Sequence, residues 1–176
     1  NGADRHEKTD RVPYTAWAQG GYCTLTPGDV TDNSYVYNWI CEGEREHGWE
    51  VEEVDYDGRN ATDLAIRMNE DRNREDFCVE VSQTCAGQNL AVKTFRELLL
   101  QDRVVIEEKP LALWCLQNAI EIQDNYGNIK LSKRHKDDTE RIDPVAAMMN
   151  ALARGLVKRT AGSDINEHIL SEDWGI

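Results

Sequence analysis

Two aspartates occupy positions from which a carboxylate could do chemistry. Asp57 ends Val54–Asp57, in which apolar and acidic side chains alternate as in a half-buried strand. Asp143 precedes Pro144 and apolar residues at helical spacing, which places it at the start of a helix. Paired carboxylates suit Mg²⁺ or Mn²⁺ and the two-metal hydrolysis of a phosphodiester. From the pattern alone, a capping Asp143 and a solvent-exposed Asp57 are the commoner outcomes.

The sequence offers little support for other chemistry. It has no Gly-rich phosphate loop, no nucleophile elbow and no paired-histidine zinc motif. The five cysteines lack zinc spacing and indicate thiols buried in a reducing compartment. The longest apolar run, Leu111–Leu116, is too short to span a bilayer, so we expect no membrane association.

Composition also limits how the chain could bind nucleic acid. Thirty-three acidic residues against 20 basic ones give the 176-residue chain a net charge of −13. A surface that grips DNA by counterion release needs a basic face, so any DNA contact requires a local basic patch or a metal. Such a patch is expected at Lys130, Lys133, Arg134, Lys136 and Arg141, although neighbouring acids make a solvated loop equally plausible.

Alternating helix and strand signals predict an α/β domain. The expected helices start near Asn33 or Ser34, after Asn60, at an Asn89 cap, near Leu111 and at Asp143. The expected strands cover 51–57 and 77–81, followed by a hairpin whose turn is 124–128. We divide the chain into a flexible approach segment (1–13), one domain (14–159) and a polar C-terminal tail (160–176).

Five stretches, in this order and spacing, resemble one protein family. They are RVPYTAW at 11–17, GYCTLTPG at 21–28, VDYDGRNA at 54–61, Asn118–Ala119 with Asp124 and GNIK at 127–130, and RIDPVAAMMNAL at 141–152. Together they are similar to the C-terminal nuclease part of HK97-like terminase large subunits of tailed phages. The resemblance implies an RNase H-like (retroviral integrase-like) fold, a mixed sheet flanked by helices.

The resemblance also implies a function and a site. Family members cut concatemeric viral DNA during genome packaging with a two-metal site of three carboxylates, in which Asp57 matches the second acid and Asp143 the third. The first acid stands on an opening strand with no counterpart before Arg11, because Asp4 and Asp10 lie in a charged segment without strand pattern. We therefore expect a domain that lacks the opening strands and is a weak or inactive nuclease.

The implied partners are double-stranded DNA, the portal protein, the small terminase subunit and an upstream packaging ATPase domain of the same protein. The implied location is the cytoplasm of the bacterial host.

Two alternatives stay open at this stage. Asp55 shares the strand face of Asp57 and could be an accessory metal ligand, although a solvated acid is the commoner outcome. The chain could also be a non-enzymatic α/β module that docks on the portal or the small terminase subunit.

Overall fold

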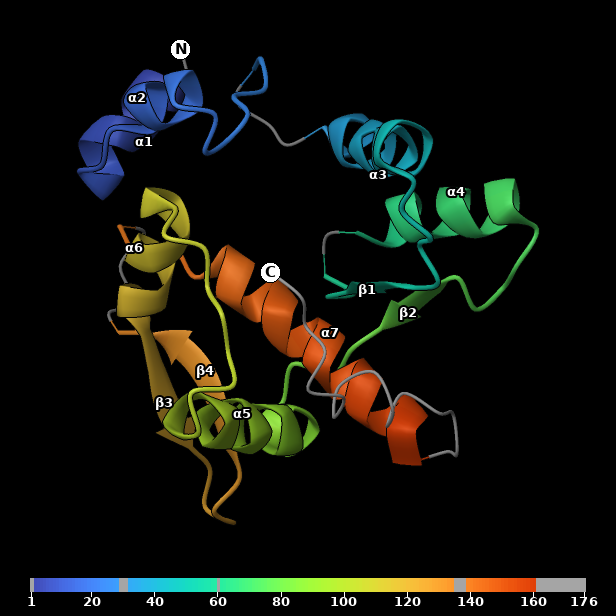
Figure 1. Cartoon of the computed structure of the whole chain (residues 1–176), viewed down its shortest axis with the longest axis vertical. Helices are drawn as coiled ribbons and strands as arrows, with labels where there is room; N and C mark the ends of the chain where they lie inside the picture. The colour runs from blue at the N-terminus through green and yellow to red at the C-terminus, as the bar shows by residue number, and fades with distance from the viewer. Residues whose placement is uncertain (1, 29–31, 60, 135–138, 161–176) are drawn as a thin grey trace.

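The computed structural model describes residues 2–28, 32–59, 61–134 and 139–160 (Figure 1). Along the chain the elements are α1 (Gly2–Asp10), α2 (Tyr14–Gln19), α3 (Asn33–His47), β1 (Val54–Tyr56), α4 (Thr62–Arg72), β2 (Cys78–Glu80), α5 (Cys85–Leu100), α6 (Pro110–Asn118), β3 (Ala119–Gln123), β4 (Ile129–Lys133) and α7 (Asp143–Thr160). The predicted α/β class is confirmed.

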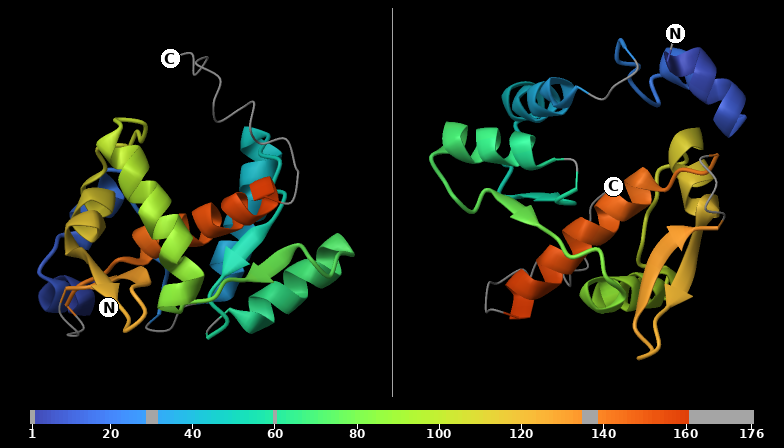
Figure 2. Two further views of the ribbon diagram at one scale, coloured as in Figure 1. Left: turned by 90° about the horizontal axis from the view of Figure 1, so that it is seen from below. Right: turned by 180° about the vertical axis from the view of Figure 1, so that it is seen from behind.

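The strands form two separate small sheets. β1 and β2 pair in parallel with Tyr56 opposite Glu80, and β3 and β4 form an antiparallel hairpin. The hairpin turn follows the predicted chemistry: Asp124 Oδ1 accepts hydrogen bonds from the backbone N–H groups of Tyr126 and Asn128, each at 2.9 Å, and Gly127 has φ +82°. The prediction of one mixed sheet is wrong for the described residues, because α5 packs on the hairpin and α7 lies between the two sheets (Figure 2).

Helix α7 separates two hydrophobic cores. One core lies under α3, α4 and β2 and contains Ile40, Ala65, Met68, Phe77 and Cys78. The other joins α5, β4 and α7 through Val92, Phe95, Ile129 and Met149. Figure 1 shows α7 running between these two halves, and the helix contacts α5 and α6 on one side and β1 on the other.

The start of α7 follows from local sequence. The helix begins at Asp143 and Pro144, as predicted, and its apolar face buries Val145 and Met149. Helix α5 differs from its prediction. It starts at Cys85 with Thr84 as N-cap, whose hydroxyl accepts a hydrogen bond from the Gly87 N–H at 3.1 Å.

The N-terminal segment also differs from its prediction. We assigned no regular structure to residues 1–13, yet Gly2–Asp10 is helical and Asp10 is buried. Its side chain is fixed by an ion pair with Arg141, a contact that no local pattern could reveal. Residues 161–176, most of the predicted polar tail, lie outside the described part of the chain.

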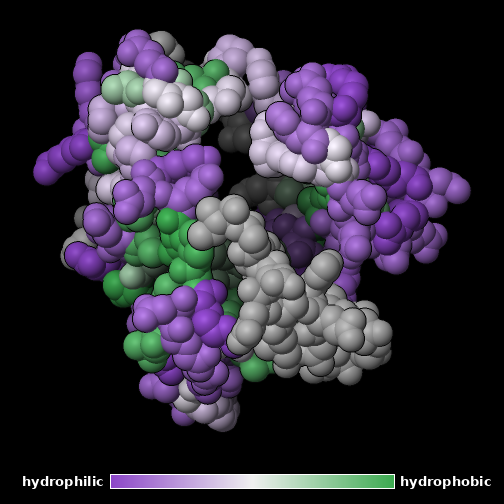
Figure 3. Space-filling model, viewed as in Figure 1, coloured by the Kyte–Doolittle hydropathy of each residue, from purple (hydrophilic) through white to green (hydrophobic). Residues whose placement is uncertain are grey.

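The cysteines are all free thiols, with Cys78 and Cys115 buried as predicted and the other three half-buried. Within the described ranges, no helix is long and apolar enough to cross a bilayer. Figure 3 shows hydrophilic residues covering α3 and α4, while apolar residues gather on the opposite half of the same face.

Candidate active site

Asp57 lies on the surface directly after β1. Its Oδ1 accepts a hydrogen bond from the Arg59 N–H at 3.2 Å, which folds the chain into a tight turn. The neighbouring Gly58 lies against the Glu80 carboxylate: a Cβ at that glycine would sit 2.4 Å from Glu80 Oε1. Strand pairing thus brings a second acid, which the sequence analysis did not single out, beside Asp57.

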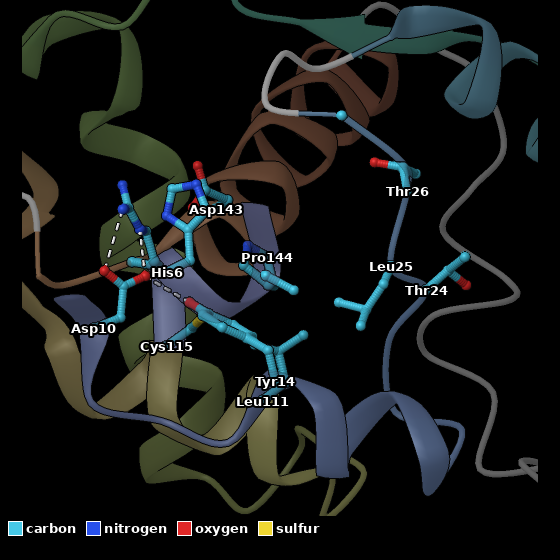
Figure 4. Close-up of a pocket in the computed structure, with 13 residues that line it drawn as sticks. His6, Asp10, Tyr14, Thr24, Leu25, Thr26, Leu111, Cys115, Asp143 and Pro144 are labelled. Atoms are coloured by element: carbon cyan, nitrogen blue, oxygen red, sulfur yellow. Dashed lines mark hydrogen bonds and ion pairs between the residues drawn. The ribbon is translucent and has the colours of Figure 1, made fainter. Parts of the chain in front are cut away.

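Asp143 lies at the first residue of α7 and lines a cavity of about 580 Å³ (Figure 4). One wall of the cavity comes from the N-terminal helices and α6, and the opposite wall contains Thr24, Leu25 and Thr26. The volume falls within the range of small-molecule sites.

A buried ion pair forms the floor of this cavity. The Arg141 guanidinium donates from Nε and Nη2 to the two carboxylate oxygens of Asp10 at 3.0 and 3.2 Å. The Asp10 side chain is 1% exposed, and its Oδ2 also accepts a hydrogen bond from the Tyr14 hydroxyl at 2.8 Å. Burial, and then this hydrogen bond, raise the pKa of Tyr14 above its ordinary value. The network ties α1 and α2 to the chain two residues before Asp143.

A second charged cluster joins β1 to α7. Arg154 donates two hydrogen bonds, at 2.8 and 3.0 Å, to the two carboxylate oxygens of Glu53. Lys158 Nζ lies 3.3 Å from Glu53, and Arg154 Nε lies 3.9 Å from Asp55 Oδ1. Asp55 Oδ1 is buried without a hydrogen-bond partner.

The pKa values of the two acids in this cluster are shifted in opposite directions. Hydrogen bonds from Arg154 lower the pKa of Glu53 to about 2. Burial, reinforced by the nearby Glu53 carboxylate, raises the pKa of Asp55 to about 7. Two acids on one face of the strand therefore differ in environment, because Glu53 is paired with Arg154 and Asp55 is desolvated.

These contacts set the direction of β1 relative to α7. Glu53 meets Lys158 and Arg154, whereas Asp55 meets Arg154, so β1 advances toward the N-terminal end of α7. Asp143 precedes Arg154 by about 16 Å of helix, and Asp57 follows Asp55 by about 7 Å of strand. Relative to Arg154, both acids therefore lie toward the N-terminal end of α7.

The predicted basic residues are in different environments. Lys130 Nζ donates to the Gln83 carbonyl at 2.9 Å, and Arg134 Nη2 donates to the Gln117 carbonyl at 3.0 Å. Lys133 ends β4, and Arg141 is engaged by Asp10. Lys136 lies outside the described residues. Lys130 and Lys133 therefore lie on β4 and Arg134 directly after it, with Lys130 and Lys133 on opposite faces of the strand, while Arg141 makes a structural contact with Asp10.

Comparison with known proteins identifies the family. The family model described as the terminase large subunit, endonuclease domain, matches residues 2–158. The chain belongs to this terminase endonuclease domain family.

Relatives of the terminase endonuclease domain agree with this assignment. The large terminase subunit of Enterobacteria phage HK97 is 30% identical over 169 residues, which cover 90% of this chain and 31% of the phage protein. The crystal structure of the HK97 bacteriophage large terminase matches with a TM-score of 0.73 at 30% identity, over 86% of this chain and 31% of that chain. The chain therefore spans about a third of the length of these relatives.

The described part of this terminase endonuclease domain does not assemble a complete metal site. Among these residues, no three His, Cys, Asp or Glu side chains lie close enough together to hold one ion. Asp57 follows β1 and Asp143 begins α7, the two belong to no such group, and Asp55 faces Arg154. Their role as metal ligands stays a prediction.

Proposed function

We propose that this chain supplies the nuclease domain of a packaging terminase, which cuts double-stranded concatemeric viral DNA. The observation that carries the proposal is the match of the endonuclease domain family over residues 2–158. The direction of β1, which leads Asp57 toward the end of α7 that carries Asp143, supports it independently.

We assign an RNase H-like fold to the domain. Parallel β1 and β2, with an acid directly after β1 and a helix that begins with another acid, support this assignment. Asp57 and Asp143 are the two ligands that this chain contributes, and carboxylate oxygens favour Mg²⁺ or Mn²⁺. Because no three metal-binding side chains form one group among the described residues, we infer that the chain alone is a weak or inactive nuclease.

The proposed partners follow from the same assignment. They are double-stranded DNA, a packaging ATPase domain of the same protein, the portal and the small terminase subunit, all in the cytoplasm of the bacterial host. On the DNA side, Lys133 and Arg134 of the hairpin region are the proposed phosphate contacts, because Arg141 is already paired with Asp10.

Plasmid nicking tests the proposal. The chain is incubated with supercoiled plasmid and Mn²⁺ or Mg²⁺, alongside Asp57→Asn, Asp143→Asn and the matched control Asp102→Asn on the α5–α6 connection. We expect weak metal-dependent nicking that falls at least about tenfold in the first two variants and is unchanged in the control. Cleavage that survives both substitutions would refute the assignment of these acids.

The strength of the signal tests the second part of the proposal. Robust nicking by the unmodified chain, abolished by Asp143→Asn, would show that the site is complete without further ligands. Absence of cleavage both here and in the full-length terminase would leave the docking module as the better account.

A further inference from the structure

Two basic side chains of α7, Arg154 and Lys158, contact Glu53 just before β1, and Arg154 makes the two-point contact. Arg154 binds both carboxylate oxygens of Glu53, and the two side chains are 27% and 10% exposed. A two-point pair of this kind has a defined geometry, unlike a single-point pair between exposed side chains. Because Arg154 is largely withdrawn from water, added salt screens the pair weakly.

The strand beside this pair is short, and its Val54 and Tyr56 side chains pack on the core under α3 and α4, away from the pair. β1 contains three residues and pairs with β2 on one side, within the described part of the sheet. Helix α7 is 18 residues long and packs on α5 and α6 as well as on β1. The helix is therefore the rigid partner, and the ion pair fixes where the short strand lies along it.

The Arg154–Glu53 ion pair, called the clamp below, also bears on the environment of Asp55. Its Oδ1 is buried and unpartnered at 3.9 Å from Arg154, beyond hydrogen-bonding distance. Arg154 thus hydrogen-bonds Glu53 and lies near Asp55 without bonding it, so burial and the Glu53 carboxylate dominate the environment of Asp55. This arrangement favours a structural role for Asp55 over the accessory metal-ligand role.

We propose that Arg154 is a positioning residue, which with Glu53 holds β1 in the register along α7 that sets the separation of Asp57 from Asp143. The proposal rests on the proposed function only for its catalytic consequence. The positioning itself is a property of the fold and is measurable without metal or DNA.

A distance measurement tests the positioning. Spin labels at R59C and A147C, both at exposed positions, report the separation of the end of β1 from the start of α7 after Cys23, Cys41 and Cys85 are replaced by serine. We expect Arg154→Met to broaden or shift the distance distribution and Arg154→Lys to restore it in part, since lysine keeps the charge without the two-point geometry. Arg96→Met, which breaks the exposed Arg96–Glu121 pair, is the matched control and leaves the distribution unchanged.

A second variant keeps the test decisive if the first one does not fold. If Arg154→Met does not fold, Glu53→Gln removes the charge of the partner carboxylate at nearly constant size, and the same distance is measured in that variant. An unchanged distance distribution in a folded clamp variant would overturn the proposal, as would a change equal to that of the Arg96 control.

Kinetics separate this proposal from the proposed function. In a terminase preparation that cleaves DNA, Arg154→Met is expected to lower kcat with little change in KM, because the hairpin contacts to DNA are remote from the clamp. A normal kcat with a shifted distance would refute the catalytic consequence. The spin-label distance could also change as expected in a terminase preparation that does not cleave DNA. That outcome would support the positioning role of Arg154 and count against the nuclease assignment.

Discussion

Asp10 and Arg141 stand 131 positions apart in the chain, yet their side chains form a two-point ion pair at 3.0 and 3.2 Å. The Asp10 side chain is almost fully buried, and the Tyr14 hydroxyl donates a third hydrogen bond to it. This pair joins the first helix of the chain to the segment that leads into α7.

Removing Asp10 is therefore expected to be costly. Asp10→Ala leaves the Arg141 guanidinium without its partner and should lower the free energy of unfolding by about 3 kcal/mol. Urea denaturation followed by circular dichroism measures the change. Glu121→Ala, which breaks the exposed pair with Arg96, should cost less than about 1 kcal/mol. Equal effects of the two substitutions would contradict a special role for the buried pair.

Two helical glycines should respond to alanine with opposite signs. A Cβ at Gly43 in α3 would lie 2.0 Å from the Trp49 ring, whereas a Cβ at Gly155 in α7 would meet no heavy atom within 4 Å. We expect Gly155→Ala to stabilise the fold by about 0.5–1 kcal/mol through helix propensity. Gly43→Ala should destabilise it by about 1–3 kcal/mol through the displaced ring. Thermal unfolding of both variants decides the matter, and stabilisation by Gly43→Ala would show that Trp49 moves aside freely.

The buried Asp55 carboxyl should make stability fall as pH rises. Its pKa increases from 3.8 in the unfolded chain to about 7 in the fold, so the folded state holds a proton that the unfolded state has lost. The free energy of unfolding should therefore decrease from about pH 4 to about pH 7. Glu53 acts in a lower window, because its lowered pKa adds stability that is lost only as pH falls from about 4.5 to about 2.

Asp55→Asn tests this assignment. The variant cannot ionise at this position, so its urea midpoint should decline less across the interval between pH 4 and 7, measured with a metal chelator present. Asp102→Asn serves as a control and should keep the slope of the unmodified chain. A steeper slope in Asp55→Asn would contradict the sign of the shift.

Two lysines of the hairpin should behave differently. Lys133→Gln should reduce the salt dependence of DNA binding by about one charge, with little change in stability. Lys130→Gln removes the hydrogen bond to the Gln83 carbonyl and should lower the free energy of unfolding by about 1 kcal/mol. Fluorescence anisotropy with a labelled duplex at several salt concentrations, paired with urea denaturation, measures both effects. An unaltered salt slope in Lys133→Gln would remove this residue from the DNA contact.

The sequence predicted those parts of the fold that local patterns determine. The start of α7 at Asp143 and Pro144 and the hairpin turn at Asp124 were correct, because capping and turn chemistry act over a few residues. The start of α5 was misplaced, because Asn89 is not a cap: its Oδ1 accepts a hydrogen bond from the Ile129 N–H, forty positions away. Helix α1 and the separation of the two sheets depend on tertiary contacts in the same way.

The same distinction between local patterns and long-range contacts applies to the candidate site. The positions of Asp57 after a strand and Asp143 at a helix start could be predicted, because each depends on its own element. The ion pair between Glu53 and Arg154 could not be predicted, because the two residues are 101 positions apart. The sequence signal for it was that Glu53 and Asp55 share one face of a strand and could therefore share a partner.

The position of α7 at the end of the described chain has a consequence for the order of assembly. Arg141, just before α7, contacts Asp10 across 131 positions, and Arg154 of α7 contacts Glu53 across 101 positions. Contacts of such long sequence separation form late, because the intervening chain must first be ordered. A ribosome that has not yet translated residues 143–160 therefore carries a nascent chain without Asp143, so the proposed pairing of Asp57 with Asp143 can form only after this helix is synthesised.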